Sequence, residues 1–434
     1  MRQNDLAGKE DIAVKKRSNW SVITFLSLVP LLMVLGNSVL IPGMPEMQNE
    51  MHVTKFQVSL IITLFSVPAG IVIPFAGFLS DRYSRRWIVV PSLLLFGAGG
   101  IAAGLAGWFI PHPYTTILIA RVVQGIGASG TAPIAMAWLG DLFSGSQRSQ
   151  ALGVNEAGNA LGKVVSPVLG AAVFLISWYA AFFIFPILCI PLAAAVWWLI
   201  PEKKTSQSKQ TVLNYIKSLG PVVKREGRWL SVAYLSGAAA LFNLFGVLFY
   251  LSDLLENKYQ IDGIRKGLVL AIPLLVLSVT SLVTGSLIKK RKKLMKWLMV
   301  SGFAILGAAL LTAVWLTSNA WVLVALMSFG AIGTGVILPS LNTLITSAVS
   351  QEQRGMVTSW YGSVRFLGVA AGPPVYTWLL SFSSGVMFIS VAVFAFVCGL
   401  LSLVLIHPKT QGSGSSEERS VPMKRSIGRH RARV

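Results

Sequence analysis

The segment Gly77–Arg86, which reads GFLSDRYSRR, joins two long apolar runs at residues 58–79 and 87–109. Each run is longer than the roughly 20 residues that an α-helix needs to cross a bilayer. Four of the ten residues in the segment are charged, and three of these are arginines. Basic residues concentrate in the cytoplasmic loops of membrane proteins. The segment therefore predicts a tight cytoplasmic turn between two membrane-spanning helices.

The composition of the whole chain agrees with a membrane protein. Of its 434 residues, 54% are hydrophobic and only 12% are charged, whereas a soluble domain carries about 25% charged residues. Mean hydropathy is +0.68. These values exclude an ordinary soluble enzyme and a disordered protein.

Twelve apolar stretches are long enough to be membrane-spanning helices. They are predicted at residues 20–42, 58–79, 87–109, 114–140, 149–176, 178–200, 229–252, 264–288, 295–317, 319–348, 354–380 and 384–407. The predicted fold class is therefore an all-α membrane protein with 12 transmembrane helices. The first stretch is too long and begins too late for a cleaved signal peptide, so we expect it to be retained.

The distribution of Lys and Arg orients this predicted topology. With both termini in the cytoplasm, 30 of the 37 Lys and Arg residues lie on the cytoplasmic side, four lie in outer loops and three lie within spans. This split follows the positive-inside rule. We therefore expect a multi-pass protein of the cell membrane, with the bacterial inner membrane as its location. The net charge of +21 is explained by topology and needs no nucleic-acid partner.

The longest loop divides the chain into two halves. We predict a cytoplasmic N-terminus at 1–19, a six-helix bundle at 20–200, a cytoplasmic linker at 201–228, a second six-helix bundle at 229–407 and a basic tail at 408–434. Apolar residues among the lysines of the linker favour a short amphipathic helix at the inner membrane surface. The tail is predicted to be disordered, and contact with anionic lipid heads is the alternative.

The two halves repeat each other at an offset of 206 residues. The matching positions are Asn37 and Asn243, Gly127 and Gly333, Pro133 and Pro339, Gln147-Arg148 and Gln353-Arg354, Gly162 and Gly368, and Pro167 and Pro373. Two parallel six-helix repeats around a central axis are typical of carriers that work by alternating access. We therefore expect a substrate site at the interface between the halves.

Three motifs resemble those of a known family. The turn at 77–86 resembles G-x-L-x-D-R-x-G-R-R, and RVVQGIG at 121–127 resembles R-x-x-Q-G-x-G. Residues 153–171 resemble the antiporter motif G-x8-G-x3-G-P-x2-G-G. The chain resembles the major facilitator superfamily on these motifs, and the third motif is similar to that of its drug:proton antiporter branch. Ser84, Ser166 and Ala171 stand where the family has glycine, and Lys289 replaces the aspartate of the turn in the second half.

The resemblance implies a function. It implies a proton-coupled secondary active exporter of small amphiphilic molecules, such as drugs or secreted metabolites, that works by alternating access. An exporter of an anionic metabolite such as a siderophore and a proton-coupled metabolite importer are the alternatives. The expected partners are a small-molecule substrate, protons and the lipid bilayer, and the expected state is a monomer.

The turn is also predicted to close the carrier on its cytoplasmic side. The resemblance assigns this gate to Gly77, Asp81, Arg82 and Arg85, and Asp141 at the end of the fourth span is a candidate partner for Arg85. The alternative is that these charges only anchor the turn in the cytoplasm.

Small residues on the fifth and eleventh spans predict tight helix packing. Gly158, Gly162 and Ser166 share one helical face, which is a pattern typical of close helix contacts. The predicted packing residues are Gly153, Gly158, Gly162, Pro167, Gly368, Gly372 and Pro373.

Four strongly charged residues lie within the spans: Arg121, Glu156, Lys163 and Arg365. Charges at this depth are rare and usually functional. Glu156 is the one carboxylate well inside, so we predict proton coupling by Glu156, with Arg121 assisting. A static salt bridge that fixes helix packing is the alternative. The residues predicted to line the substrate cavity are Asn37, Arg121, Gln124, Glu156, Lys163, Asn243, Tyr361 and Arg365.

Three cations against one anion favour an anionic, zwitterionic or neutral amphiphile as substrate. The sequence predicts no catalytic residue, no metal site and no cofactor, because Cys189 and Cys398 lie in apolar runs and no histidine lies deep within one. A phosphate-binding G-x-x-x-x-G-K-[ST] loop is absent from the sequence, so direct coupling to ATP is not expected. The chain is therefore not predicted to be an enzyme.

Overall fold

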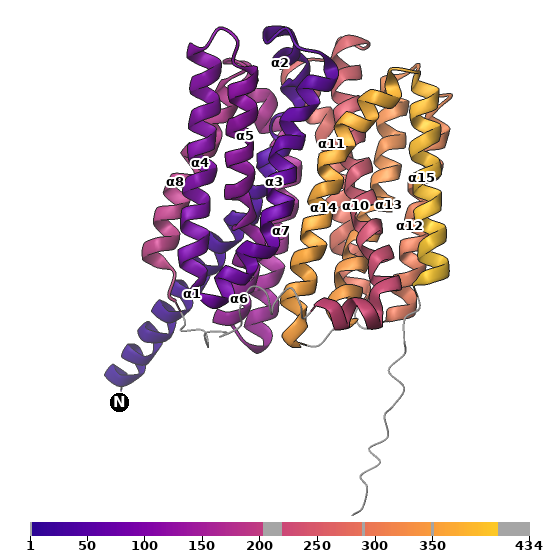
Figure 1. Cartoon of the computed structure of the whole chain (residues 1–434). Helices are drawn as coiled ribbons and strands as arrows, with labels where there is room; N and C mark the ends of the chain where they lie inside the picture. Colours follow the sequence, from indigo (N-terminus) through magenta and orange to yellow (C-terminus); the bar gives the residue numbers. More distant parts are fainter. Residues whose placement is uncertain (1, 203–218, 289–290, 349–350, 407–434) are drawn as a thin grey trace, which may run out of the picture.

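The computed structural model describes residues 2–202, 219–288, 291–348 and 351–406, and every regular element in these ranges is a helix (Figure 1). Side chains are described from residue 19 onward, except at 145, 219–226, 348 and 351–354 within these ranges. The predicted basic tail, most of the predicted linker with its amphipathic segment, and Lys289 lie outside the described residues.

Two groups of helices follow the order of the sequence. The first contains α1 (Arg2–Ser38), η1 (Ile41–Gly43), α2 (Met44–Glu50), α3 (Lys55–Arg82), α4 (Arg85–Phe109), α5 (Tyr114–Ser129), α6 (Ala132–Leu142), α7 (Gly145–Phe174) and α8 (Ala180–Leu199). The second contains α10 (Leu219–Asn257), α11 (Gly263–Ile288), α12 (Lys292–Ala313), α13 (Ala320–Ala348), α14 (Gln351–Leu380) and α15 (Ser384–Leu405). Figure 1 shows the two groups side by side, as two halves of one helical bundle.

Most of the predicted spans are long apolar helices. Among the described residues, 11 helical segments are long and apolar enough to cross a membrane. The remaining predicted span, at 354–380, corresponds to α14, which has 30 residues but includes Arg365 and is less apolar. Helix α14 packs along α3 and α10, so it occupies the place of a spanning helix.

Two predicted spans are interrupted in the structure, which the sequence analysis did not expect. The first span ends as an α-helix at Ser38, and its chain continues through η1 and α2. The fourth span is divided into α5 and α6 at Gly130 and Thr131. Prolines open η1, α2 and α6. Because proline has no backbone N–H, it is tolerated in the first turn of a helix and disfavoured further inside one.

The predicted repeat is visible in the packing. A Cβ atom added at Gly127 of α5 would meet the backbone of Phe96 in α4, and one added at Gly333 of α13 would meet the backbone of Gly302 in α12. Both members of this contact are shifted by 206 residues. The two halves therefore use the same close helix approach at equivalent positions.

The halves meet along two seams, one between α3 and α14 and one between α7 and α11. The hydroxyl of Thr63 donates to the Ala370 carbonyl across the first seam, at 2.7 Å. The hydroxyl of Ser278 donates to the Ala160 carbonyl across the second, at 3.3 Å. We call the two ends of the bundle the α2 end and the α6 end, which are uppermost and lowermost in Figure 1.

Candidate functional site

Helix α7 packs against α1 through its stripe of small residues. A Cβ atom added at Gly158 would meet the carbonyl group of Ser27, and one added at Gly162 would lie 3.1 Å from the carbonyl oxygen of Leu31. Ser166 on the same face is fully buried. Such small residues allow two helix backbones to touch. The stripe thus fixes which face of α7 is turned away from α1.

The equivalent stripe in the second half joins α14 to α10. A Cβ atom at Gly368 would meet the backbone of Ala238, and one at Gly372 would lie 2.6 Å from the Phe242 carbonyl oxygen. Pro167 and Pro373 are buried in α7 and α14. Gly153 departs from the prediction of packing, because it is exposed and a Cβ atom there would have no neighbour within 4 Å.

The polar face of α7 carries two of the predicted site residues. Glu156 is exposed and Lys163 is partly exposed, and they share one helical face because they are seven residues apart. Glu156 and Arg365 of α14 are the charged groups that act electrostatically on Lys163. The structure therefore brings Glu156, Lys163 and Arg365 together between the halves.

Helix α14 adds unsatisfied polar atoms to the same region. The guanidinium of Arg365 lies over the ring of Tyr361, with 5.3 Å between the Arg365 Cζ and the ring centroid. The hydroxyl of Tyr361 and the Nε of Arg365 are buried and have no hydrogen-bond partner among the described residues. A buried donor without a partner costs about 1–3 kcal/mol, so both groups favour an acceptor that comes from outside the chain.

Asn159 is a further candidate residue that the sequence analysis missed. It lies between Glu156 and Lys163 on the same face of α7, and it is partly exposed. The repeat offset of 206 maps it onto Arg365, so applying the offset to the charged residues would have found it. We call Glu156, Asn159, Lys163, Tyr361 and Arg365 the central site.

Arg121 lies inside the first half. It is fully buried, and its guanidinium donates to the Ile61 carbonyl at 3.0 Å, to the Gly36 carbonyl at 2.9 Å and to Oδ1 of Asn37 at 2.8 Å. It also donates to Oε1 of Gln124 at 2.7 Å. Its Cζ lies 4.4 Å from the centroid of the Phe65 ring.

This network concerns one prediction. Arg121, Gln124 and Asn37 were expected to line the substrate cavity, which remains a prediction, and in the structure all three are buried and bind each other within the first half. The cause is the interruption of α1, because the last carbonyl groups of a helix have no partner within it. Arg121 supplies a positively charged donor at that helix end, which also suits the helix dipole.

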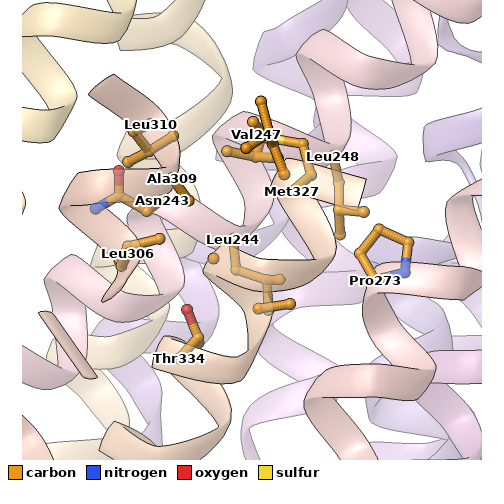
Figure 2. Close-up of a pocket in the computed structure, with 13 residues that line it drawn as sticks. Asn243, Leu244, Val247, Leu248, Pro273, Leu306, Ala309, Leu310, Met327 and Thr334 are labelled. Atoms are coloured by element: carbon orange, nitrogen blue, oxygen red, sulfur yellow. The ribbon is translucent and has the colours of Figure 1, made fainter. Parts of the chain in front are cut away.

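The second half has no equivalent of this arginine. The offset of 206 places Met327 at the position of Arg121 and Gly330 at that of Gln124. Figure 2 shows a pocket at this position, between α10, α11, α12 and α13, that is lined by Asn243, Met327 and mostly apolar side chains. Asn243 is buried and bonds the Ala239 carbonyl and the Tyr376 hydroxyl. Asn243 thus lines this pocket, and its place in the substrate cavity remains a prediction.

The α6 end carries the turn that was predicted as a gate. Arg85 pairs with Asp81, with 2.5 Å between Nη1 and Oδ1, and with Asp141, with 3.1 Å between Nε and Oδ2. A Cβ atom at Gly77 would lie 2.9 Å from the Ser359 hydroxyl oxygen, across the α3–α14 seam. Arg82 lies beside the ring of its neighbour Tyr83. The pairing of Arg85 with Asp141 is confirmed, whereas its role as a gate remains a prediction.

The α2 end carries a link between the halves that the sequence analysis missed. Lys55 in the first turn of α3 pairs with Asp253 of α10, with 2.8 Å between Nζ and Oδ2. The hydroxyl of Ser252 donates to the Ile41 carbonyl at 2.8 Å. No local sequence pattern predicts this ion pair, because Lys55 and Asp253 are 198 residues apart.

Metal binding finds no support in the described part of the chain. No group of three or more His, Cys, Asp or Glu residues there could hold a metal ion. Cys189 and Cys398 are buried free thiols in α8 and α15.

Comparison with known proteins identifies the family. The model of the Major Facilitator Superfamily matches residues 26–373 and again 296–432. The chain belongs to the major facilitator superfamily. It is therefore a multi-pass membrane transporter and not an enzyme.

Two bacterial relatives illustrate where the chain lies within the superfamily. It is 44% identical over 401 residues to the bacillibactin exporter of Bacillus subtilis, covering 92% of this chain and 98% of that protein. It is 24% identical over 359 residues to a multidrug efflux protein of the same organism, covering 78% and 81%. Both names describe export.

Solved structures of the superfamily share the fold. The human organic anion transporter MFSD10 superposes with a TM-score of 0.66 at 20% identity, covering 88% of this chain and 99% of that one. A bacterial homologue of the lysosomal transporter Spinster, inward-facing and occupied, has a TM-score of 0.70 at 16% identity, covering 88% and 96%. At these identities the likeness concerns the fold alone.

Proposed function

We propose that this transporter exports a small anionic amphiphile of the siderophore class in exchange for protons, with the central site as its binding site. The observation that carries the proposal is the pair of cations on opposite halves, Lys163 and Arg365, beside unpartnered donors of Arg365 and Tyr361. Donors that converge from both halves suit an oxygen anion. The relative named as a bacillibactin exporter supports the siderophore class.

The charges give the site a means of alternation. Glu156 lies close enough to Lys163 to act on it electrostatically. A carboxylate there binds either a proton or a hydrogen-bond donor of the substrate, and not both at once. Protonation of Glu156 therefore favours substrate departure, and substrate binding favours proton release, which is the alternation that exchange requires.

The expected orientation places both termini and the α6 end in the cytoplasm of a bacterial cell. The cluster Asp81, Arg85 and Asp141 then closes the cytoplasmic side, and Lys55 with Asp253 closes the outer side. A single chain contains both halves and both closures, so a monomer suffices for the cycle.

Export is tested with bacillibactin, the compound named for the relative. Everted membrane vesicles from cells that express the chain should accumulate bacillibactin when the lumen is acidic, and a protonophore should abolish the accumulation. Arg365→Gln should abolish it as well, because one of the two cations is lost. Arg291→Gln is the matched control, since Arg291 is an exposed residue beside α12.

Two results would contradict the proposal. Equal accumulation in vesicles with and without the chain would exclude bacillibactin as substrate. Accumulation that persists after the pH gradient is collapsed would exclude coupling to protons.

Broad drug efflux is the second candidate function. The relative named as a multidrug efflux protein favours it. A lipophilic cation such as ethidium separates the two candidates, because Lys163 and Arg365 repel cations. Ethidium export at wild-type rates in the Arg365→Gln variant, together with absent bacillibactin export in both proteins, would favour drug efflux.

A further inference from the structure

A second pocket lies at the α2 end, on the seam between α3 and α14. Its lining includes Lys55 from the first half and Tyr250, Asp253 and Tyr376 from the second. Tyr250 and Tyr376 are buried, so the pocket has aromatic walls and an ion pair. Because it joins the two halves, it must change shape whenever they separate.

The two members of the ion pair are held differently. Asp253 has a second partner on its own helix, because the side-chain amide of Asn257 donates to its other oxygen at 2.8 Å. For the Lys55 amine, Asp253 is the one partner among the described residues. The Lys55 side chain is also the more exposed, at 42% against 13% for Asp253. Asp253 therefore stays with α10 when the seam opens, and Lys55 is left with a free charge.

The position of Lys55 makes that free charge unfavourable. Lys55 is the first residue of α3, and the N-terminal end of a helix carries a partial positive charge that disfavours cations. Lys266, a buried lysine at the same end, differs because Glu256 of the same half holds it. An anion is therefore favoured at Lys55 as soon as Asp253 leaves.

We propose that this pocket is an outer anion subsite, in which an anionic group of the substrate replaces Asp253 on Lys55 and thereby opens the outer side. The aromatic walls contributed by Tyr250 and Tyr376 contact the apolar part of the same molecule. The subsite rests on the proposed function for its substrate, and it extends that function by giving the anion a second cation, Lys55, near the exit.

The proposal distinguishes two variants that break the same bond. Asp253→Asn frees Lys55 and leaves its charge, whereas Lys55→Met breaks the pair and removes the charge. A simple latch predicts the same consequence for both variants. An anion subsite predicts opposite consequences for anion binding.

The measurement is equilibrium binding of radiolabelled benzoate, benzylamine and benzyl alcohol to the purified full-length chain in lipid nanodiscs. These probes share one ring and differ in charge. We expect Asp253→Asn to raise benzoate affinity about fivefold, which corresponds to the loss of one competing exposed ion pair. Lys55→Met should lower benzoate affinity below that of the wild type. Lys258→Met, at an exposed lysine that bonds the Thr317 carbonyl, should change nothing.

Two outcomes overturn the subsite. One is an equal change of benzoate affinity in Asp253→Asn and Lys55→Met. The other is a change for benzyl alcohol in Asp253→Asn as large as that for benzoate. If Asp253→Asn does not fold, Lys55→Arg provides a second test, because it keeps the positive charge. A loss of benzoate binding in Lys55→Arg equal to that in Lys55→Met would overturn the subsite as well. Binding requires no export, so failure of bacillibactin export would leave this result standing.

Discussion

Arg121 and Asn37 are joined by a hydrogen bond of 2.8 Å between Nη2 and Oδ1, and both side chains are buried. Arg365 is the opposite case, because its Nε is buried without a partner. The two arginines of the membrane interior therefore differ in what they do. One completes the fold of the first half, and the other is available to a ligand.

Replacing each arginine by methionine separates these roles. Arg121→Met leaves the acceptors of Gly36, Ile61 and Asn37 without their donor, so the free energy of unfolding should fall by about 3 kcal/mol or more. Arg365→Met removes a donor that has no partner, so stability should not fall while bacillibactin transport is lost. The measurements are the melting temperature in detergent and vesicle transport. Equal melting temperatures for the two variants would contradict the assignment.

Glycine substitutions on α7 test the contact with α1. Gly162→Leu should stop transport at normal expression, because its side chain would push against the Leu31 backbone and overpacking costs about 1–3 kcal/mol. Gly153→Leu is the matched control, because a Cβ atom there has no neighbour within 4 Å. Full transport by Gly162→Leu would show that the close contact is dispensable.

The charge cluster at the α6 end is tested by Asp81→Asn and Asp141→Asn. Each variant leaves Arg85 with one of its two carboxylate partners, so turnover should fall while membrane insertion and expression persist. Vesicle transport gives the turnover, and immunoblotting of membranes gives the insertion. If both variants transport at the wild-type rate, the cluster only anchors the turn.

Glu156→Gln tests proton coupling at nearly constant side-chain size. Glu156 is exposed, and no ion pair within 4 Å is described for it, so the melting temperature should not change. Uphill transport driven by a pH gradient should disappear, while downhill exchange of bacillibactin continues. Accumulation at the wild-type level would exclude Glu156 as the proton carrier. A lowered melting temperature with coupling intact would instead favour the static role.

The sequence predicted structural features correctly where the pattern involves neighbouring residues or the internal repeat. The turn at 77–86 and the offset of 206 predicted the pairing of Arg85 with Asp141 and the matching contacts of Gly162 and Gly368. Helix periodicity placed Glu156 and Lys163 on one face of α7, because that relation depends only on 3.6 residues per turn.

Contacts between residues that are far apart in the sequence could not be predicted from local patterns or from the repeat. The cost of burying Arg121 was clear from its depth, but two of its acceptors are backbone carbonyl groups of other helices, and every residue has a carbonyl. Lys55 was interpreted as one more cation of an outer loop because Asp253 lies in the other half. The interruptions of the first and fourth spans were missed because apolar composition continues through them.

The seams between the halves are closed unequally at the α6 end. The α3–α14 seam is tight there at Gly77 and Ser359, whereas Cβ atoms at Gly153 of α7 and Gly285 of α11 would have no neighbours within 4 Å. Exposed Leu161 and Leu287 lie on the same two helices. Fewer close contacts therefore have to break along the α7–α11 seam than along the α3–α14 seam when the halves separate at this end.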